Sequence, residues 1–230
     1  MPVSQTKGLR AAMLDTVIYP AYRLIESVAS LTGAGFAIVL FTLAVRLLLL
    51  PLSIRQAKAA KARMRLAPKV EALRKRFGRD PERLYRETTK LYAAEGTSMF
   101  AGILPGLAQS PFFMVTYRVF VAATIAGHPN LLLAQSALGV PLGDHFATAI
   151  ATGGLFGAPA LVFVGLFALL AVVAWIVSRR MGEVQPRALR LLPYATVVFA
   201  TFLPLAAGLY LLVSTAWTAV ERALLYPKPA

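Results

Sequence analysis

The sequence predicts an all-α polytopic membrane protein with five membrane-spanning helices. The 230 residues are 58% hydrophobic and only 15% charged, and their mean hydropathy is +0.66. One soluble core could not bury so much apolar surface. The apolar residues gather in segments of roughly 20, the length that crosses about 30 Å of hydrocarbon. Much of the net charge of +14 lies between these segments, where it indicates the topology.

The first 34 residues are predicted to lie outside, as a short tail followed by an amphipathic helix on the membrane interface. Residues 15–32 alternate apolar and polar positions at helical spacing. Residues 1–14 lack the apolar core of a secretory signal, so the first span, residues 35–54, is expected to serve as an uncleaved anchor.

Residues 55–98 are predicted to form a basic helical hairpin. Thirteen basic residues stand against five acidic ones there, so the positive-inside rule makes the region cytoplasmic. The turn Gly78-Arg79-Asp80-Pro81 supplies a C-terminal glycine, an N-cap aspartate and a proline at the first helical position. The charge either fixes the topology and contacts anionic lipids, or also binds the ribosome or another acidic partner. The candidate contact residues are Arg74, Lys75, Arg76 and Arg79.

Four further spans are predicted, at residues 99–123, 157–178, 188–203 and 204–224. The last two are separated because residues 191–220 would be about 45 Å long as one helix, and Pro204 offers a break. The loop 124–156 has no lysine or arginine and is expected outside. The loop 179–187 and the tail 225–230 are expected in the cytoplasm, which places the amino terminus outside.

Arg46 lies within the first apolar segment and is the main candidate for a functional charge. A guanidinium keeps its charge in proteins, and placing it near the middle of a span costs about 2.5–3.5 kcal/mol. Its side chain either extends to the cytoplasmic interface, roughly 12 Å away, or faces a watery cavity and binds an anionic group.

Other polar residues lie at a similar depth in their spans. Those about eight to ten positions from the expected cytoplasmic end are Arg46, Gln109, Ser214 and Thr215. Tyr210, Ser214 and Thr218 follow i, i+4, i+8 spacing, so one face of the last span could turn toward Arg46. The hydroxyls could instead bond to carbonyls of their own helix.

The sequence predicts neither an enzyme, a metal site nor a cofactor. It has no cysteine and no nucleotide-binding Gly-x-x-x-x-Gly-Lys-Ser/Thr loop. Both histidines lie in the outer loop, where Asp144-His145 is most simply a loop or helix-cap pair, and Glu221 is the only carboxylate at a span end. A small-anion transporter or channel with Arg46 as its mid-membrane anion site is the alternative, although no inverted repeat is evident.

Four stretches of the chain resemble the YidC-type membrane protein insertases. They are Val45 to Gln56, Leu91 to Gly96, Leu104 to Arg118, and Pro204 to Trp217, and the likeness extends over about residues 15–224. The resemblance implies a five-span core in the plasma membrane of a bacterium. It also implies a hydrophilic groove, open to the cytosol and the inner leaflet, that contains Arg46 and Gln109.

The resemblance further implies that nascent membrane proteins are the clients. Their hydrophilic tails would move through the groove while their apolar segments enter the bilayer, with the ribosome and the general secretion channel as further partners. Two positions depart from the family: Ser98-Met99 stands where Asn-Pro is frequent, and Leu211 where a tryptophan is usual. Only Arg222 and Lys228 add positive charge at the end of the chain, so a ribosome contact through the tail is not expected.

Overall fold

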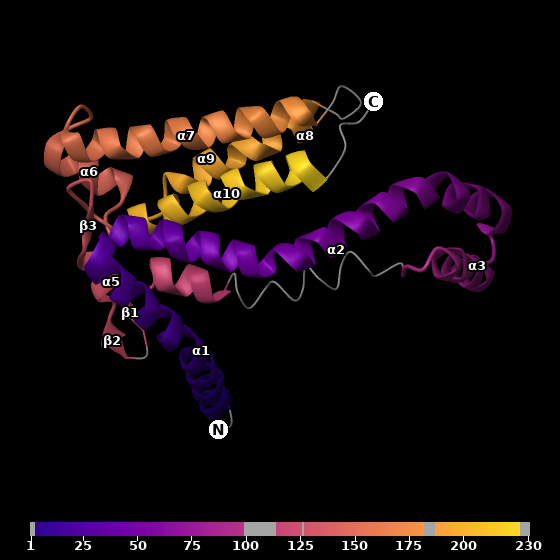
Figure 1. Cartoon of the computed structure of the whole chain (residues 1–230), viewed down its shortest axis with the longest axis horizontal. Coiled ribbons are helices and arrows are strands. Elements are labelled where there is room, and N and C mark those ends of the chain that lie inside the picture. The colour runs from indigo at the N-terminus through magenta and orange to yellow at the C-terminus, as the bar shows by residue number, and fades with distance from the viewer. Residues whose placement is uncertain (1–2, 99–113, 126, 182–186, 226–230) are drawn as a thin grey trace.

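The computed structural model describes residues 3–98, 114–125, 127–181 and 187–225. Figure 1 shows a bundle of helices from which one long helix, α2, extends far to one side. Gln109 and Met99, which the sequence analysis singled out, lie outside the described residues.

The first two helices meet at a glycine corner. α1 (Val3–Thr32) and α2 (Ala34–Phe77) are separated by Gly33, whose φ of 86° favours a residue without a Cβ atom. Both helices are longer than the sequence analysis predicted. In particular, α2 continues without a break past residue 54, because the alanine-, lysine- and arginine-rich segment that follows consists of good helix formers. Figure 1 shows that α2 changes direction near its middle, as expected of a helix with two internal prolines.

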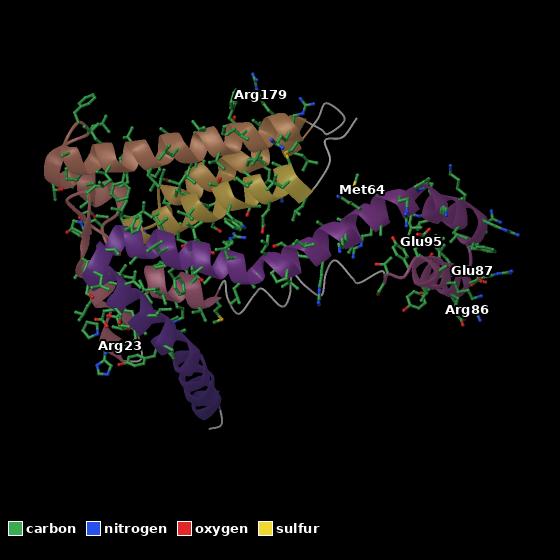
Figure 2. All side chains as sticks on the ribbon, viewed as in Figure 1. Arg23, Met64, Arg86, Glu87, Glu95 and Arg179 are labelled. Carbon is green, nitrogen blue, oxygen red and sulfur yellow. The ribbon has the colours of Figure 1, made fainter. Side chains whose placement is uncertain are left out.

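The far end of α2 pairs with α3 (Pro81–Ala94). The Asp80 carboxylate accepts a hydrogen bond from the backbone N–H of Arg83 at 3.0 Å and so caps α3. Arg65 and Lys69 of α2 both pair with Glu95, at the end of α3. Figure 2 shows Arg86, Glu87 and Glu95 together at this end of the molecule, away from the bundle.

Residues 114–125 and 127–157 form several short elements, where the sequence predicted the end of a span followed by an outer loop. Residues 114–121 are helical. Two short antiparallel hairpins and two short helices follow: β1 (Thr124–Ile125) with β2 (His128–Pro129), α5 (Leu131–Ala134), β3 (Ser136–Ala137) with β4 (Val140–Pro141), and α6 (Phe146–Gly153). The turn Leu138-Gly139 joins the second hairpin with positive φ at both residues, 54° and 79°.

The last helices complete the bundle. They are α7 (Ala158–Arg180), α8 (Arg187–Leu191), the 3-10 turn η1 (Leu192–Tyr194), α9 (Ala195–Ala200) and α10 (Leu205–Leu225). The predicted span 188–203 is thus three short helical pieces, because Pro193 lacks the N–H that a continuous α-helix needs. The chain turns before α10, next to Pro204.

Two of the described helices, α2 and α7, are both long and apolar enough to cross a membrane. α10 has 21 residues and is about 31 Å long, but its serine, threonine, glutamate and arginine residues reduce its hydropathy. The predicted number of five spans stays a prediction.

The apolar core lies at the end of the bundle where α2, α7 and α10 begin. Phe120 and Phe163 are fully buried there. The first N–H groups of α10 have no partners in their own helix, and the loop between β4 and α6 supplies acceptors for them. Leu205 N donates to the carbonyl of Asp144 and Ala206 N to that of Leu142, each at 2.9 Å. This end is therefore held by backbone hydrogen bonds as well as by packing.

Candidate functional site: a polar pocket between α2 and α10

Arg46 reaches across from α2 to α10. Its guanidinium Nη2 donates to the side-chain hydroxyl of Ser214, and also to the Ser214 backbone carbonyl at 3.2 Å. Ser214 is buried, with 6% of its surface exposed. α2 and α10 start at the same end of the bundle and pack against each other. The side chain of Arg46 therefore turns toward a neighbouring helix instead of extending along its own.

A polar pocket of about 240 Å³ opens beside this contact, and we call it the Arg46 pocket. Its residues come from two helices: Arg46, Ser53 and Gln56 of α2, and Thr218, Glu221, Arg222 and Leu225 of α10. On α2 these positions follow one another at intervals of seven and three, which places them on one helix face. Two facing helix surfaces with polar side chains therefore form the pocket.

Charges in the Arg46 pocket do not form close ion pairs with one another. The ion pairs within 4.0 Å in the described part of the chain all lie elsewhere, in α1 and in the α2–α3 hairpin. Two residues that line the pocket each have a buried polar atom without a hydrogen-bond partner among the described residues: Gln56 Nε2 and Glu221 Oε1. Buried polar groups are normally paired, so unpaired ones mark a place where a bound group or water can complete the bonding.

The predicted polar face of α10 divides in two. Ser214 contacts Arg46 and Thr218 lines the pocket, while Thr218 Oγ1 also donates to the Ser214 carbonyl at 2.9 Å. Tyr210 instead packs against Phe120, with ring centroids 5.7 Å apart. The Thr215 hydroxyl bonds back to the carbonyl of Leu211 at 2.7 Å. The structure thus brings Arg46, Ser214 and Thr218 together, and places Tyr210 and Thr215 in other contacts.

Four polar pocket residues were not predicted as site residues from the sequence: Ser53, Gln56, Glu221 and Arg222. Their signal was present. Ser53 and Gln56 continue the helical spacing that begins at Arg46, and Glu221 continues the one that begins at Ser214. On α2 the helix continues past the predicted border at residue 54 and so brings Gln56 to the pocket, whereas Glu221 and Arg222 lie within the predicted last span.

The basic residues predicted to contact a partner lie at the distant end of α2 and in the turn that follows it. Arg74, Lys75, Arg76 and Arg79 are all exposed. Lys75 pairs weakly with Glu71 at 4.0 Å, and the guanidinium of Arg76 lies 5.2 Å from the Phe77 ring centroid. None of them lines the Arg46 pocket.

The described residues include no group of three or more histidine, aspartate or glutamate side chains placed to hold a metal ion. His145 precedes α6 as its N-cap residue, without a side-chain capping bond. The loop around Asp144 contributes a backbone carbonyl to α10, as described above.

The family model described as 60Kd inner membrane protein matches residues 26–229. The chain belongs to this family. The match includes both faces of the Arg46 pocket and both helices of the α2–α3 hairpin. Together with the two long apolar helices, family membership identifies the chain as an inner-membrane protein. The predicted resemblance is confirmed.

Curated relatives in the 60Kd inner membrane protein family carry related names. The membrane protein insertase YidC of Histophilus somni is 31% identical over 209 residues, which are 90% of this chain and 36% of the relative. That of Zymomonas mobilis is 30% identical over 181 residues, 76% of this chain and 31% of the relative. The chloroplastic inner membrane ALBINO3-like protein 1 of Chlamydomonas reinhardtii is 30% identical over 159 residues, 61% and 32% of the two chains. The matches span less than half of the length of these relatives.

Proposed function

We propose that this chain is a membrane protein insertase that moves the hydrophilic tails of small membrane proteins past Arg46. The observation that carries the proposal is the Arg46 pocket: a permanent charge on an apolar helix, held by Ser214 at the edge of a polar cavity. An arginine that only extended to the interface would not need this cross-helix bond. The relatives described above are named membrane protein insertases, which favours an insertase over the small-anion transporter.

The mechanism is electrostatic and needs no catalytic group. A hydrophilic tail carries peptide groups and carboxylates that hydrocarbon cannot solvate. A polar pocket inside the bundle shortens the apolar distance that such a tail must cross. Arg46 can donate two parallel hydrogen bonds to a carboxylate of the tail, and a single transient contact allows release. The pocket is thus suited to passage, and we assign the chain no enzymatic activity, metal or cofactor.

The client's apolar segment needs a separate path into the bilayer, and α7 offers one. Its residues from Ala158 to Val177 carry no charge, and large apolar side chains such as Leu161, Leu169 and Val172 are exposed on it. Contact with a second apolar helix satisfies these side chains as well as lipid does, so a client can exchange between the two.

The pocket mechanism is tested with Arg46 variants in proteoliposomes. Two clients share one apolar segment, and their short translocated tails carry either two aspartates or two asparagines. Arg46→Ala should reduce insertion of the aspartate client about tenfold and spare the asparagine client, because only the first needs the charge. Arg46→Lys should keep much of the activity, although it loses the bidentate geometry.

Arg55→Ala is the matched control, since Arg55 is an exposed arginine of the same helix that does not line the pocket. It should leave both clients unaffected. Equal loss of both clients in Arg46→Ala would contradict the charge-pairing mechanism, and absence of insertion by the wild type would contradict the insertase assignment.

We further propose the five-span topology, with the amino terminus outside and the α2–α3 hairpin in the cytoplasm. Its support is the charge distribution and the placement of the basic hairpin and of β3–β4 at opposite ends of the molecule. The cysteine-free chain allows a direct test with an impermeant thiol reagent on intact cells. Ser136→Cys should be labelled and Met64→Cys protected, both positions being exposed. The reverse pattern would overturn the orientation.

For the basic hairpin we propose a contact with the acidic surface of the ribosome. The motivating observation is that Arg74, Lys75 and Arg76 are exposed and that the α2–α3 hairpin projects beyond the bundle. Replacing Arg74, Lys75 and Arg76 by alanine should reduce salt-sensitive co-sedimentation with ribosomes. The control is replacement of Arg179 and Arg180, an exposed basic pair at the end of α7. Unchanged co-sedimentation of the hairpin variant would leave the charge a topological role.

A further inference from the structure

Glu221 is a carboxylate inside the cavity that holds the proposed client-binding arginine. It lines the Arg46 pocket together with Arg46 and Arg222. One of its oxygens, Oε1, is buried and has no hydrogen-bond partner among the described residues. A buried carboxylate oxygen without a hydrogen bond is unfavourable unless another interaction compensates for its desolvation. The presence of Glu221 in a pocket with two arginines therefore needs an explanation.

A structural ion pair does not provide that explanation. Arg46 directs its guanidinium to Ser214, and no ion pair within 4.0 Å in the described part of the chain includes Arg46, Arg222 or Glu221. The negative and positive charges thus face one cavity without neutralising each other by direct contact. Both are available to a third group that enters the space.

The two charges also lie at different depths. Glu221 follows Ser214, the partner of Arg46, by seven residues along α10, which is about 10 Å of helix. In the proposed topology the end of α10 with Glu221 is the cytoplasmic one. A tail that enters from the cytoplasm therefore passes the carboxylate first and the guanidinium of Arg46 second.

We propose that Glu221 is a specificity-determining residue that lets the Arg46 pocket accept basic groups of a client tail as well as acidic ones; this rests on the insertase function proposed above. With Arg46 and Arg222 alone, the pocket would carry two positive charges and repel a lysine. The carboxylate of Glu221 lowers this to one and supplies a local partner for an ammonium group. The client class is thereby widened to tails that carry charges of both signs.

The experiment compares three clients that share one apolar segment and differ in the tail, which carries two lysines, two asparagines or two aspartates. Insertion into proteoliposomes is measured for the wild type, Glu221→Gln and Glu221→Asp. Glu221→Gln preserves shape and removes the charge, and it should lower insertion of the lysine client about two- to fivefold relative to the asparagine client. The aspartate client should insert as well as before or better. Glu221→Asp keeps the negative charge, so it should insert the lysine client about as well as the wild type does.

Glu82→Gln is the matched control, because Glu82 is an exposed carboxylate on α3 and its loss changes the net charge equally. It should affect no client. An equal response of all three clients to Glu221→Gln, or no response, would overturn the role of Glu221 while leaving the insertase function intact. If the wild-type protein inserts no client to a greater extent than protein-free vesicles do, the insertase function itself is contradicted.

Discussion

The packed pair of helices α2 and α10 is lined by apolar side chains at one end and by polar and charged side chains further along. At the end where both helices begin, Ala37 and Ile38 of α2 and Leu205 and Ala206 of α10 are almost fully buried in an apolar core. About three turns further along, the same two helices face each other with polar and charged side chains around the Arg46 pocket. One pair of helices thus provides both a firm junction and an open polar space.

The difference teaches how a pocket with a charge can persist in an apolar bundle. Its walls gain little from apolar contacts with each other, so their positions are fixed by the packed end. There the segment of residues 127–157 caps α10, and the Tyr22 hydroxyl of α1 accepts a hydrogen bond from Leu131 N at 3.2 Å. Stability and function are therefore separated along the helix axes, and substitutions at the two ends should have different consequences.

The largest expected effect is on stability, at the packed end. Phe163 is fully buried in a cluster with Phe146 and Phe167, at ring-centroid distances of 5.9 and 6.2 Å. Phe163→Ala should reduce the free energy of unfolding by about 3–5 kcal/mol, because it leaves a cavity that the neighbours only partly fill. Phe199→Ala, at a position 67% exposed, should change it little. Thermal unfolding in detergent measures both, and similar losses would break the comparison.

A smaller loss of stability is expected from a substitution at a tight contact between α2 and the segment of residues 127–157. A Cβ atom added to Gly35 would lie 2.8 Å from Ala137 Cβ, which has no rotamer by which to move away. Gly35→Ala should cost about 1–3 kcal/mol of unfolding free energy, as overpacking does. Gly165→Ala on α7 meets nothing within 4 Å and should be neutral or slightly stabilising. Thermal unfolding in detergent measures both variants. An equal change in the free energy of unfolding at both glycines would contradict close packing between Gly35 and Ala137.

The sequence predicted the packed end less well than the polar one. Arg46 was identifiable because a charge in an apolar segment is costly, and Ser214 because helical spacing and depth aligned with it. Residues 124–157 contain no lysine or arginine and no long periodic pattern, so the short hairpins in this part of the chain could not be predicted. The capping of α10 by the carbonyls of Leu142 and Asp144 depends on backbone geometry, which residue types do not reveal.

The ends of the helices do not coincide with the borders of the predicted apolar spans. Hydropathy marks where an apolar segment ends, but a helix ends where its backbone hydrogen bonds do. α2 therefore continues to Phe77, and the pocket includes Gln56 beyond the predicted border at residue 54. Glu221 was noticed only as a terminal carboxylate, since its relation to Arg46 appears only when the two helices are placed side by side.

A moderate effect on function is expected from Ser214, without a large effect on stability. Ser214→Ala removes the hydroxyl acceptor of Arg46 but leaves the carbonyl acceptor at 3.2 Å. Insertion of the aspartate client should fall about threefold relative to the asparagine client, because the guanidinium is less well positioned. Thr215→Ala is the control, since that hydroxyl bonds only within its own helix among the described contacts. Equal losses for both clients would indicate a merely structural serine.

The smallest expected effect concerns the hairpin, which belongs to neither end of the bundle and is held largely by exposed contacts. The hydrogen bond from Lys90 Nζ, 3.0 Å from Glu87 Oε1, and the charge of Lys90 lower the pKa of Glu87 from its ordinary value of 4.5. Because the folded-state pKa is below the unfolded one, the stabilisation is present above pH 4.5 and is lost as the pH falls through the folded-state pKa.

Hydrogen exchange of the α3 amides, corrected for the intrinsic effect of pH, measures this loss. Protection should decrease slightly on acidification in the wild type, and by less in Glu87→Gln, which has no carboxylate to protonate. The amides at the packed start of α2 should show no matching change, because apolar contacts there do not titrate. An identical pH response in the wild type and Glu87→Gln would show that the Glu87–Lys90 pair contributes nothing to the hairpin, in line with the weakness of most exposed ion pairs.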